Sequence, residues 1–255
     1  MIFNWHINFY KFRFNPLKLE IRKKVIDRQN SIYFSLNLDR MLALNKLNKI
    51  LLDNFGKEYD ENNGMWSEHL LLFSAISISY PQKMKSILEI GTFNGETAFI
   101  LSKLFPHSKI TTIDLNNSNL KEIEEYSYAF DSSESHFVSN RDKILKLNKN
   151  IDFIQMNSLN LFNSNAKYDL IWIDGAHGFP FVAIDLSNAL RMVNSDGFIL
   201  CDDVYTSTTK NSMITDSMAT FITLQKFQEA LNLKTSLVPK RISQKNVKYI
   251  AVVEM

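Results

Sequence analysis

The chain has 255 residues, of which 45% are hydrophobic and 22% are charged, and its formal net charge is +2. This length suffices for one sizeable α/β domain with an extension, and the balanced charge does not indicate binding to nucleic acid or to a membrane surface. No apolar stretch approaches the ~18 residues that a membrane span requires, and the N-terminus lacks the apolar core of a signal peptide. We therefore expect a cytoplasmic protein whose single cysteine, Cys201, is a buried core thiol.

Residues 1–66 are predicted to form a helical extension. The first 33 residues are aromatic, basic and weakly periodic. Asn37 is a candidate cap for a helix over Leu38–Phe55, whose apolar residues lie along one stripe and which Gly56 would end. We expect this extension to act as a lid over a substrate pocket, and its apolar helix could also serve as the interface of a homo-oligomer.

Residues 67–255 are predicted to form one α/β domain. Ser67 is a candidate cap for a helix over Glu68–Tyr80, which Pro81 ends. Short β-type runs then alternate with helical ones, which predicts right-handed βαβ units and a parallel sheet. The polar segment Lys240–Val247 reads as a hairpin between the last two strands, so one of them should be antiparallel.

The expected fold is therefore a Rossmann-like, doubly wound, mostly parallel seven-stranded sheet with an antiparallel last strand and a helical N-terminal extension. The predicted strands are Ile87–Ile90, Ile110–Ile113, Phe153–Met156, Leu170–Ile173, Phe198–Cys201, Ser236–Val238 and Tyr249–Val253. The predicted helices after Pro81 are Glu96–Leu104, Asn119–Tyr128, Asp142–Asn148, Pro180–Met192 and Ser217–Leu231.

A glycine turn, Glu89-Ile90-Gly91-Thr92-Phe93-Asn94-Gly95, joins the first strand to the next helix. Glycine lacks a Cβ, so the chain can turn sharply and a cofactor can approach the backbone, while the helix directs unpaired N–H groups at it. The spacing excludes the G-x-G-x-x-G fingerprint of dinucleotide sites, because Phe93 and Glu96 stand where glycines are needed. An NAD-dependent oxidoreductase is therefore disfavoured.

Polar residues follow the next strands, at the edge where ligands of open α/β sheets bind. Asp114 follows Ile-Thr-Thr-Ile, a position from which a carboxylate reaches two ribose hydroxyls. Asn157 and Ser158 follow the third strand, and the Asn157 amide could hydrogen-bond an adenine edge. The alternative for each is an ordinary turn residue, since Asp and Asn are common in turns.

Three acids, Asp174, Asp202 and Asp203, follow two adjacent predicted strands, so their side chains could converge. Three oxygen ligands suit a hard divalent ion such as Mg²⁺, which could lower the pKa of a bound substrate hydroxyl. The alternative is that these acids cap helices or bond loop N–H groups. His177 lies in the loop after Asp174 and could act as a general base, or be a polar loop residue. Tyr205 and the pair Glu68-His69 are weaker candidates.

These residues resemble a known family. The segment Ile87–Gly95 looks like the first motif of class I S-adenosylmethionine-dependent methyltransferases, and Asp114 matches the acidic end of their second strand. Asp169–His177, Asp185-Leu186 and Gly197–Val204 resemble the branch of small-molecule and sugar O-methyltransferases, akin to the macrolide-sugar enzymes. The resemblance covers the chain from Ser67 to Val253.

The resemblance implies a role for each matching residue. Glu89 and Gly91 would hold the methionine part of S-adenosylmethionine, Asp114 the ribose, and Asn157-Ser158 would lie by the adenine. The sequence departs from the family at Asn157, where Asp is usual, and at Phe179, where a Tyr often follows the His. The full set implied for the cofactor is Glu89, Gly91, Thr92, Phe93, Asn94, Gly95, Asp114, Asn157, Ser158 and Asp174; that for Mg²⁺ is Asp174, Asp202 and Asp203.

The expected function is methyl transfer from S-adenosylmethionine to a hydroxyl of a small molecule or sugar, with a divalent metal assisting and with His177 and Asp174 as the catalytic residues. Two alternatives stay open. One is a metal-independent N- or O-methyltransferase, and the other is a non-catalytic scaffold of the same fold. No nucleic acid partner is expected.

Overall fold

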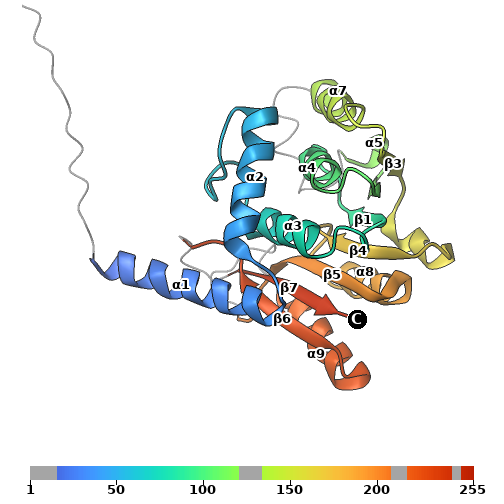
Figure 1. The fold of residues 1–255 in the computed structure, drawn as a ribbon. Helices are drawn as coiled ribbons and strands as arrows, with labels where there is room; N and C mark the ends of the chain where they lie inside the picture. Colours follow the sequence, from blue (N-terminus) through green and yellow to red (C-terminus); the bar gives the residue numbers. More distant parts are fainter. Residues whose placement is uncertain (1–15, 121–133, 208–216, 243–247) are drawn as a thin grey trace, which may run out of the picture.

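The computed structural model describes residues 16–120, 134–207, 217–242 and 248–255. Seven strands in these residues form one sheet in the order β3-β2-β1-β4-β5-β7-β6. Strands β1 to β5 pair in parallel, and β7 is antiparallel to both β5 and β6 (Figure 1). The strands are β1 Ser86–Ile90, β2 Lys109–Asp114, β3 Ile151–Gln155, β4 Tyr168–Ile173, β5 Val193–Val204, β6 Lys234–Pro239 and β7 Tyr249–Glu254.

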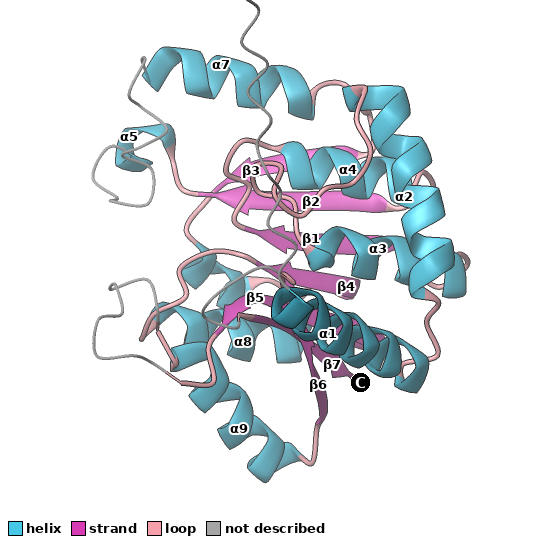
Figure 2. Cartoon of the chain, turned by 90° about the vertical axis from the view of Figure 1, so that its left-hand side faces the viewer, coloured by secondary structure: helices cyan, strands magenta, loops and turns pink. Residues whose placement is uncertain are grey.

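Helices cover both faces of this sheet. Figure 2 shows α1 lying over β6 and β7, and α1 contacts β6. The helices are α1 Pro16–Ser35, α2 Arg40–Phe55, α3 Glu68–Ser79, α4 Glu96–Leu104, α5 Asn117–Leu120, α7 Glu134–Leu145, α8 Phe181–Met192 and α9 Ala219–Leu231, with a 3₁₀ helix, η2, over Ser158–Asn163. The expected Rossmann-like fold with an antiparallel last strand is confirmed.

The core consists of two clusters separated by the sheet, because successive strand residues point to opposite faces. Ile87 belongs to the cluster that includes residues of α1 to α4, whereas the next residue, Leu88, belongs to the cluster that includes residues of α8 and α9. The same alternation places Leu200 in the first cluster and Cys201 in the second. Cys201 is buried, as expected. The N-terminal helices thus share one core with the sheet, since Tyr33 and Leu47 belong to the first cluster.

Several boundaries differ from the sequence prediction. Asp39 rather than Asn37 caps α2, accepting a hydrogen bond from the Leu42 N–H, while Gly56 ends the helix in the left-handed conformation as predicted. Ser67 stands at the N-cap of α3, but its hydroxyl pairs with His69 Nδ1 at 2.7 Å instead of a backbone N–H. Capping was assigned to the wrong Asx residue because Asn37 itself turns the chain, with φ of 56°.

Four other elements depart from expectation. Helix α1 lies in the predicted helical extension, but the sequence analysis gave it no bounds. Helix α7 begins eight residues before Asp142, and Pro180 lies at the N-cap of α8 rather than inside it. The predicted helix Asn119–Tyr128 lies mostly outside the described residues, as does much of the Lys240–Val247 hairpin turn. Strand β5 continues to Val204, so Asp202 and Asp203 lie within the strand, not after it. No helix in the described part of the chain is long and apolar enough to cross a membrane.

Candidate active site

The carboxyl ends of the central strands are joined by backbone hydrogen bonds. The Gly91 N–H donates to Ile113 O at 3.0 Å, and the Asp174 N–H donates to Ile90 O at 2.8 Å. These bonds extend the pairing of β1 with β2 and β4 past the strand ends. The glycine turn, Asp114 and Asp174 therefore meet at one edge of the sheet, as their sequence positions predicted.

The close approach of Asp174 allows only glycine at position 91. Gly91 adopts φ of +100°, and a Cβ at this position would lie 2.1 Å from the Asp174 carbonyl oxygen. Gly95, with φ of +80°, begins α4, and a Cβ there would lie 3.0 Å from the Leu145 side chain. The sequence analysis explained both glycines by the approach of a cofactor. The structure gives a second reason for each glycine: Gly91 packs against the end of β4, and Gly95 packs against α7.

Asp114 closes β2 and is 8% exposed. Its Oδ2 accepts the Phe93 N–H at 2.7 Å and its Oδ1 accepts the Leu115 N–H at 2.8 Å. These two bonds fix the carboxylate beside the glycine turn. The Asp114 carboxylate is thereby held at the carboxyl edge of the sheet, where a ligand of an open α/β sheet would bind.

Glu89 is fully buried beneath the turn. Its Oε2 accepts the Thr112 hydroxyl at 2.5 Å, and that hydroxyl also pairs with the Thr92 hydroxyl at 2.6 Å. Burial raises the pKa of Glu89 to about 8, so the carboxyl stays largely protonated at neutral pH. Its Oε1 has no hydrogen-bond partner among the described residues, which fits a site that a polar ligand completes.

Two asparagines assigned to the cofactor make local bonds. Asn94 Oδ1 accepts the Glu96 N–H at 3.0 Å, and Asn157 Oδ1 accepts the Leu159 N–H at the start of η2 at 2.9 Å. Both bonds are the turn-forming kind that the alternative interpretation described. Their contacts, and that of Ser158, with a cofactor stay predictions.

Sequence reasoning missed the residues that α7 contributes near the glycine turn. The rings of Phe93 and Phe137 lie 5.3 Å apart. Arg141 is buried, with its guanidinium carbon 4.6 Å from the Phe153 ring centroid, and it donates to Asn117 Oδ1 at 3.0 Å. These contacts were missed because the predicted helix here began only at Asp142, which excluded Phe137 and Arg141.

The second group of predicted residues also converges. His177 Nε2 lies 3.6 Å from Asp174 Oδ1. Burial and the neighbouring Asp202 carboxylate raise the pKa of Asp174 well above its usual range. Asp203 adopts φ of +47° where the pairing of β5 with β7 shifts register. This irregularity turns both Asp202 and Asp203 toward the same cluster although they are adjacent in a strand.

The acids do not fit a divalent metal as they stand. Lys240 Nζ lies 2.5 Å from Asp202 Oδ2 and 2.6 Å from Asp203 Oδ1. Lys248 Nζ lies 2.7 Å from Asp203 Oδ2. Within the described ranges, no group of three or more His, Cys, Asp or Glu side chains could hold a metal ion. The sequence predicted Mg²⁺ at Asp174, Asp202 and Asp203. In the structure, two lysine ammonium groups lie against the carboxylates of Asp202 and Asp203 instead.

The weaker candidates divide between this cluster and the core. His69 is buried and stacked on Trp172 at 5.2 Å, and burial lowers its pKa to about 3, so it is neutral. Tyr205 is buried beneath Lys248, whose Nζ lies 5.1 Å from the ring centroid. Glu68 instead binds Arg40 through two hydrogen bonds, at 2.5 and 2.9 Å, and so ties α2 to α3.

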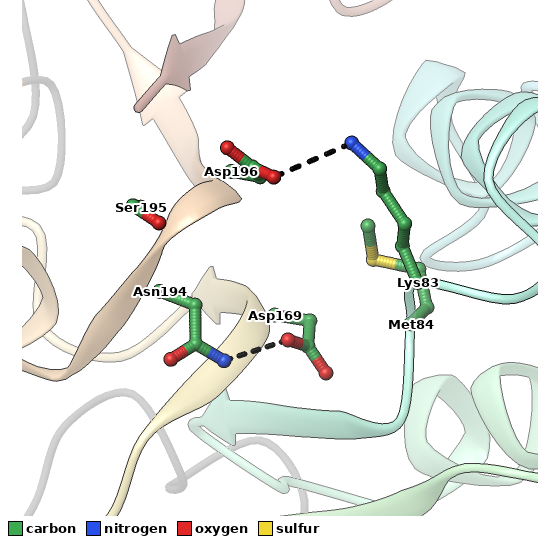
Figure 3. Close-up of a pocket in the computed structure, with 6 residues that line it drawn as sticks. All are labelled: Lys83, Met84, Asp169, Asn194, Ser195 and Asp196. Atoms are coloured by element: carbon green, nitrogen blue, oxygen red, sulfur yellow. Dashed lines mark hydrogen bonds and ion pairs between the residues drawn. The ribbon is translucent and has the colours of Figure 1, made fainter.

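A shallow pocket lies at the opposite edge of the sheet, near the amino ends of β4 and β5 (Figure 3). Asp169 there accepts from Asn194 at 2.7 Å and from the N–H groups of Lys85 and Ser86 at 2.8 and 2.9 Å. These bonds give Asp169 a structural role. Ligands of open α/β sheets bind at the carboxyl edge, so we assign no chemistry to this pocket.

Comparisons with known proteins identify similarities of sequence and fold. Residues 88–204 match a family model described as a methyltransferase domain. The match begins in β1, just before the glycine turn, and ends with β5, so it includes Asp114, the Asp174–His177 loop, Asp202 and Asp203. No curated protein matches the chain in sequence.

Solved structures resemble most of the chain. A Klebsiella pneumoniae protein described as an O-methyltransferase is 13% identical with a TM-score of 0.56, over 92% of this chain and 99% of its own. The Bacillus cereus O-methyltransferase in complex with SAH is 14% identical with a TM-score of 0.56, over 82% and 97%. TomG, a Streptomyces achromogenes O-methyltransferase involved in tomaymycin synthesis and solved with SAM, is 16% identical with a TM-score of 0.53, over 90% and 97%.

At these identities the likeness establishes the fold, and the family model adds a similarity in sequence over residues 88–204. The strand order, the reversed β7 and the glycine turn after β1 all agree with the resemblance that the sequence suggested. The chain therefore has the Rossmann-like fold of these O-methyltransferase structures, and residues 88–204 are similar to a methyltransferase domain.

Proposed function

We propose that this chain transfers a methyl group from S-adenosylmethionine to a hydroxyl of a small molecule or sugar. The observation that carries the proposal is the meeting of two groups at one edge of the sheet. The glycine turn with Asp114 forms one group, and the Asp174–His177 pair forms the other. The backbone contact between Gly91 and Asp174 joins them.

The cofactor would lie across the glycine turn. Asp114 would accept hydrogen bonds from the ribose hydroxyls, and Glu89 would offer its unpaired Oε1 toward the methionine part. The Phe93 ring, packed against Phe137, would supply an apolar surface beside the turn. When bound, S-adenosylmethionine supplies a methyl group on a sulfonium sulfur, which is electrophilic without further activation.

The protein must then align the acceptor and remove its proton. His177 is the proposed general base, because it follows β4 beside Asp174 at the candidate site and a neutral imidazole nitrogen can accept a proton. His177 Nε2 would take the hydroxyl proton of the acceptor as its oxygen accepts the methyl group, and S-adenosylhomocysteine would be the leaving product. Asp174 Oδ1, 3.6 Å from this nitrogen, would help to orient the imidazole ring toward the acceptor.

Product formation tests this function directly. The purified chain is incubated with methyl-labelled S-adenosylmethionine and a panel of sugars and phenols, and methyl ethers are detected by mass spectrometry. We expect His177→Gln to lower kcat by about 10²–10⁴-fold without changing affinity for S-adenosylhomocysteine. The matched control is His107→Gln, at the opposite edge of the sheet, which should leave kcat unchanged.

Two results would argue for the alternatives. Transfer to amines but not to hydroxyls would identify an N-methyltransferase. Failure to detect binding of S-adenosylmethionine by calorimetry would favour a non-catalytic scaffold. The likeness to O-methyltransferase structures supports methyl transfer to a hydroxyl over both of these alternatives.

A further inference from the structure

The hairpin of β6 and β7 brings two lysines face to face. Pro239 pairs with Tyr249 in the last rung of the ladder, and the Lys240 N–H donates to Lys248 O at 2.8 Å. Lys240 and Lys248 are therefore directly opposite each other on adjacent strands. Like charges in this position destabilise a hairpin unless anions lie between or beside them.

Asp202 and Asp203 supply these anions. Of their four carboxylate oxygens, three lie against lysine ammonium groups: Asp202 Oδ2 and Asp203 Oδ1 against Lys240, and Asp203 Oδ2 against Lys248. Lys240 is only 7% exposed. A lysine is almost never so buried unless it is paired, and Lys240 is paired with two carboxylates at once.

The backbone around Lys240 is held from two sides. The Glu68 N–H, at the start of α3, donates to Lys240 O at 3.1 Å. On the preceding residue, Pro239 O accepts the Gln29 side-chain amide of α1 at 2.9 Å. The ammonium group is thus positioned by the hairpin and by two helices from the N-terminal part of the chain, far from β5 in sequence.

We infer that the ammonium groups of Lys240 and Lys248 take the place of a divalent metal ion beside Asp202 and Asp203, so that the chain needs no such ion. Mg²⁺ requires near-octahedral oxygen ligands at close range. Of the four carboxylate oxygens of Asp202 and Asp203, only Asp202 Oδ1 lacks a hydrogen-bond partner among the described residues. A metal would also have to lie beside two positive charges. Lys240 acts as a positioning residue that keeps both carboxylates in place.

The first test measures metal binding and is independent of activity. Mn²⁺ is titrated into the full chain and followed by electron paramagnetic resonance. The wild-type chain should bind no stoichiometric Mn²⁺, whereas the double variant Lys240→Ala, Lys248→Ala should gain one site. The control is Lys234→Ala, which removes an exposed lysine of the same hairpin and should gain none.

Stoichiometric Mn²⁺ binding by the wild-type chain, abolished by Asp202→Asn, would overturn the inference. The double variant leaves two acids without their partners, so its folding is checked by circular dichroism with and without 10 mM Mg²⁺, and stabilisation of this variant alone by Mg²⁺ would support the inference. If it stays unfolded under both conditions, the wild-type titration by itself decides.

The second test concerns catalysis and rests on the proposed function. Methyl transfer by the wild-type chain should be unchanged in excess EDTA, and loss of activity restored by Mg²⁺ would contradict the inference. A chain that transfers no methyl group would refute the proposed function, while the Mn²⁺ titration would still decide the role of the two lysines.

Discussion

The carbonyl oxygen of Asp174 occupies the space where any side chain on Gly91 would begin. A Cβ on Gly91 would lie 2.1 Å from this oxygen, well inside van der Waals contact. The turn after β1 and the loop after β4 are thereby locked together. This contact sets the position of the presumed cofactor turn relative to Asp174, so one glycine controls the geometry of both halves of the candidate site.

Gly91→Ala should destabilise the chain by more than ~3 kcal/mol, because the left-handed backbone costs roughly 1–2 kcal/mol and the clash with Asp174 adds to it. Urea unfolding followed by circular dichroism measures the change. Gly64→Ala is the control, since Gly64 has φ of +58° but nothing within 4 Å of the added Cβ. Equal losses in the two variants would show that the contact with Asp174 is unimportant.

Asp114→Ala should weaken binding of S-adenosylhomocysteine by ~1–3 kcal/mol, the cost of leaving buried polar partners without a hydrogen bond. Isothermal titration calorimetry gives the affinity. Asp152→Ala, at a half-exposed acid on the neighbouring strand β3, should have no effect. Unchanged affinity in Asp114→Ala would refute the assignment of this residue to the ribose.

Glu89 should make the stability of the cofactor-free chain depend on pH. Its pKa is raised from an ordinary value of 4.5 to about 8, so the folded chain binds this proton more tightly than the unfolded chain. The stabilisation is fully present below pH 4.5 and is lost as the pH rises through 8. The Glu89→Gln variant has no proton to lose at this position, so its stability lacks this dependence on pH.

We therefore expect wild-type stability to fall between pH 5 and pH 8 by at least ~1.4 kcal/mol more than that of Glu89→Gln, the equivalent of one pKa unit. Chemical denaturation at both pH values measures the difference. Glu229→Gln, at an exposed acid of α9, should follow the wild type. Parallel pH profiles for wild type and Glu89→Gln would contradict the raised pKa.

Arg40→Ala should destabilise the chain by ~3–5 kcal/mol, because it leaves the buried Glu68 carboxylate without its bidentate partner. The comparison is Lys24→Ala, which breaks an exposed pair with Glu20 and should cost less than about 1 kcal/mol. Thermal unfolding of both variants tests the difference. A small effect of Arg40→Ala would mean that the Arg40–Glu68 pair contributes little to holding α2 against α3.

The fold was predictable because its signals are local. Alternating apolar runs, the glycine turn and the acid after β2 each depend on a few neighbouring residues, and each was found where the sequence placed it. Helix boundaries were less predictable, since capping depends on which side chain reaches a free N–H. Asn37 and Asp39 are both suitable in type, and only the backbone conformation at Asn37 excludes it.

The sequence by itself determined which residues lie at the carboxyl edge of the sheet. The glycine turn, Asp114 and the Asp174–His177 loop each follow a strand, and parallel strands share a direction, so these segments must lie at the same edge. Only the tertiary structure decided what neutralises Asp202 and Asp203. Lys240 and Lys248 reach them through antiparallel pairing and a register shift in β5, contacts between residues about 40 positions apart that no local pattern encodes. Charge pairs of this kind depend on side-chain positions in space, so the cation beside these acids became visible only in the folded chain.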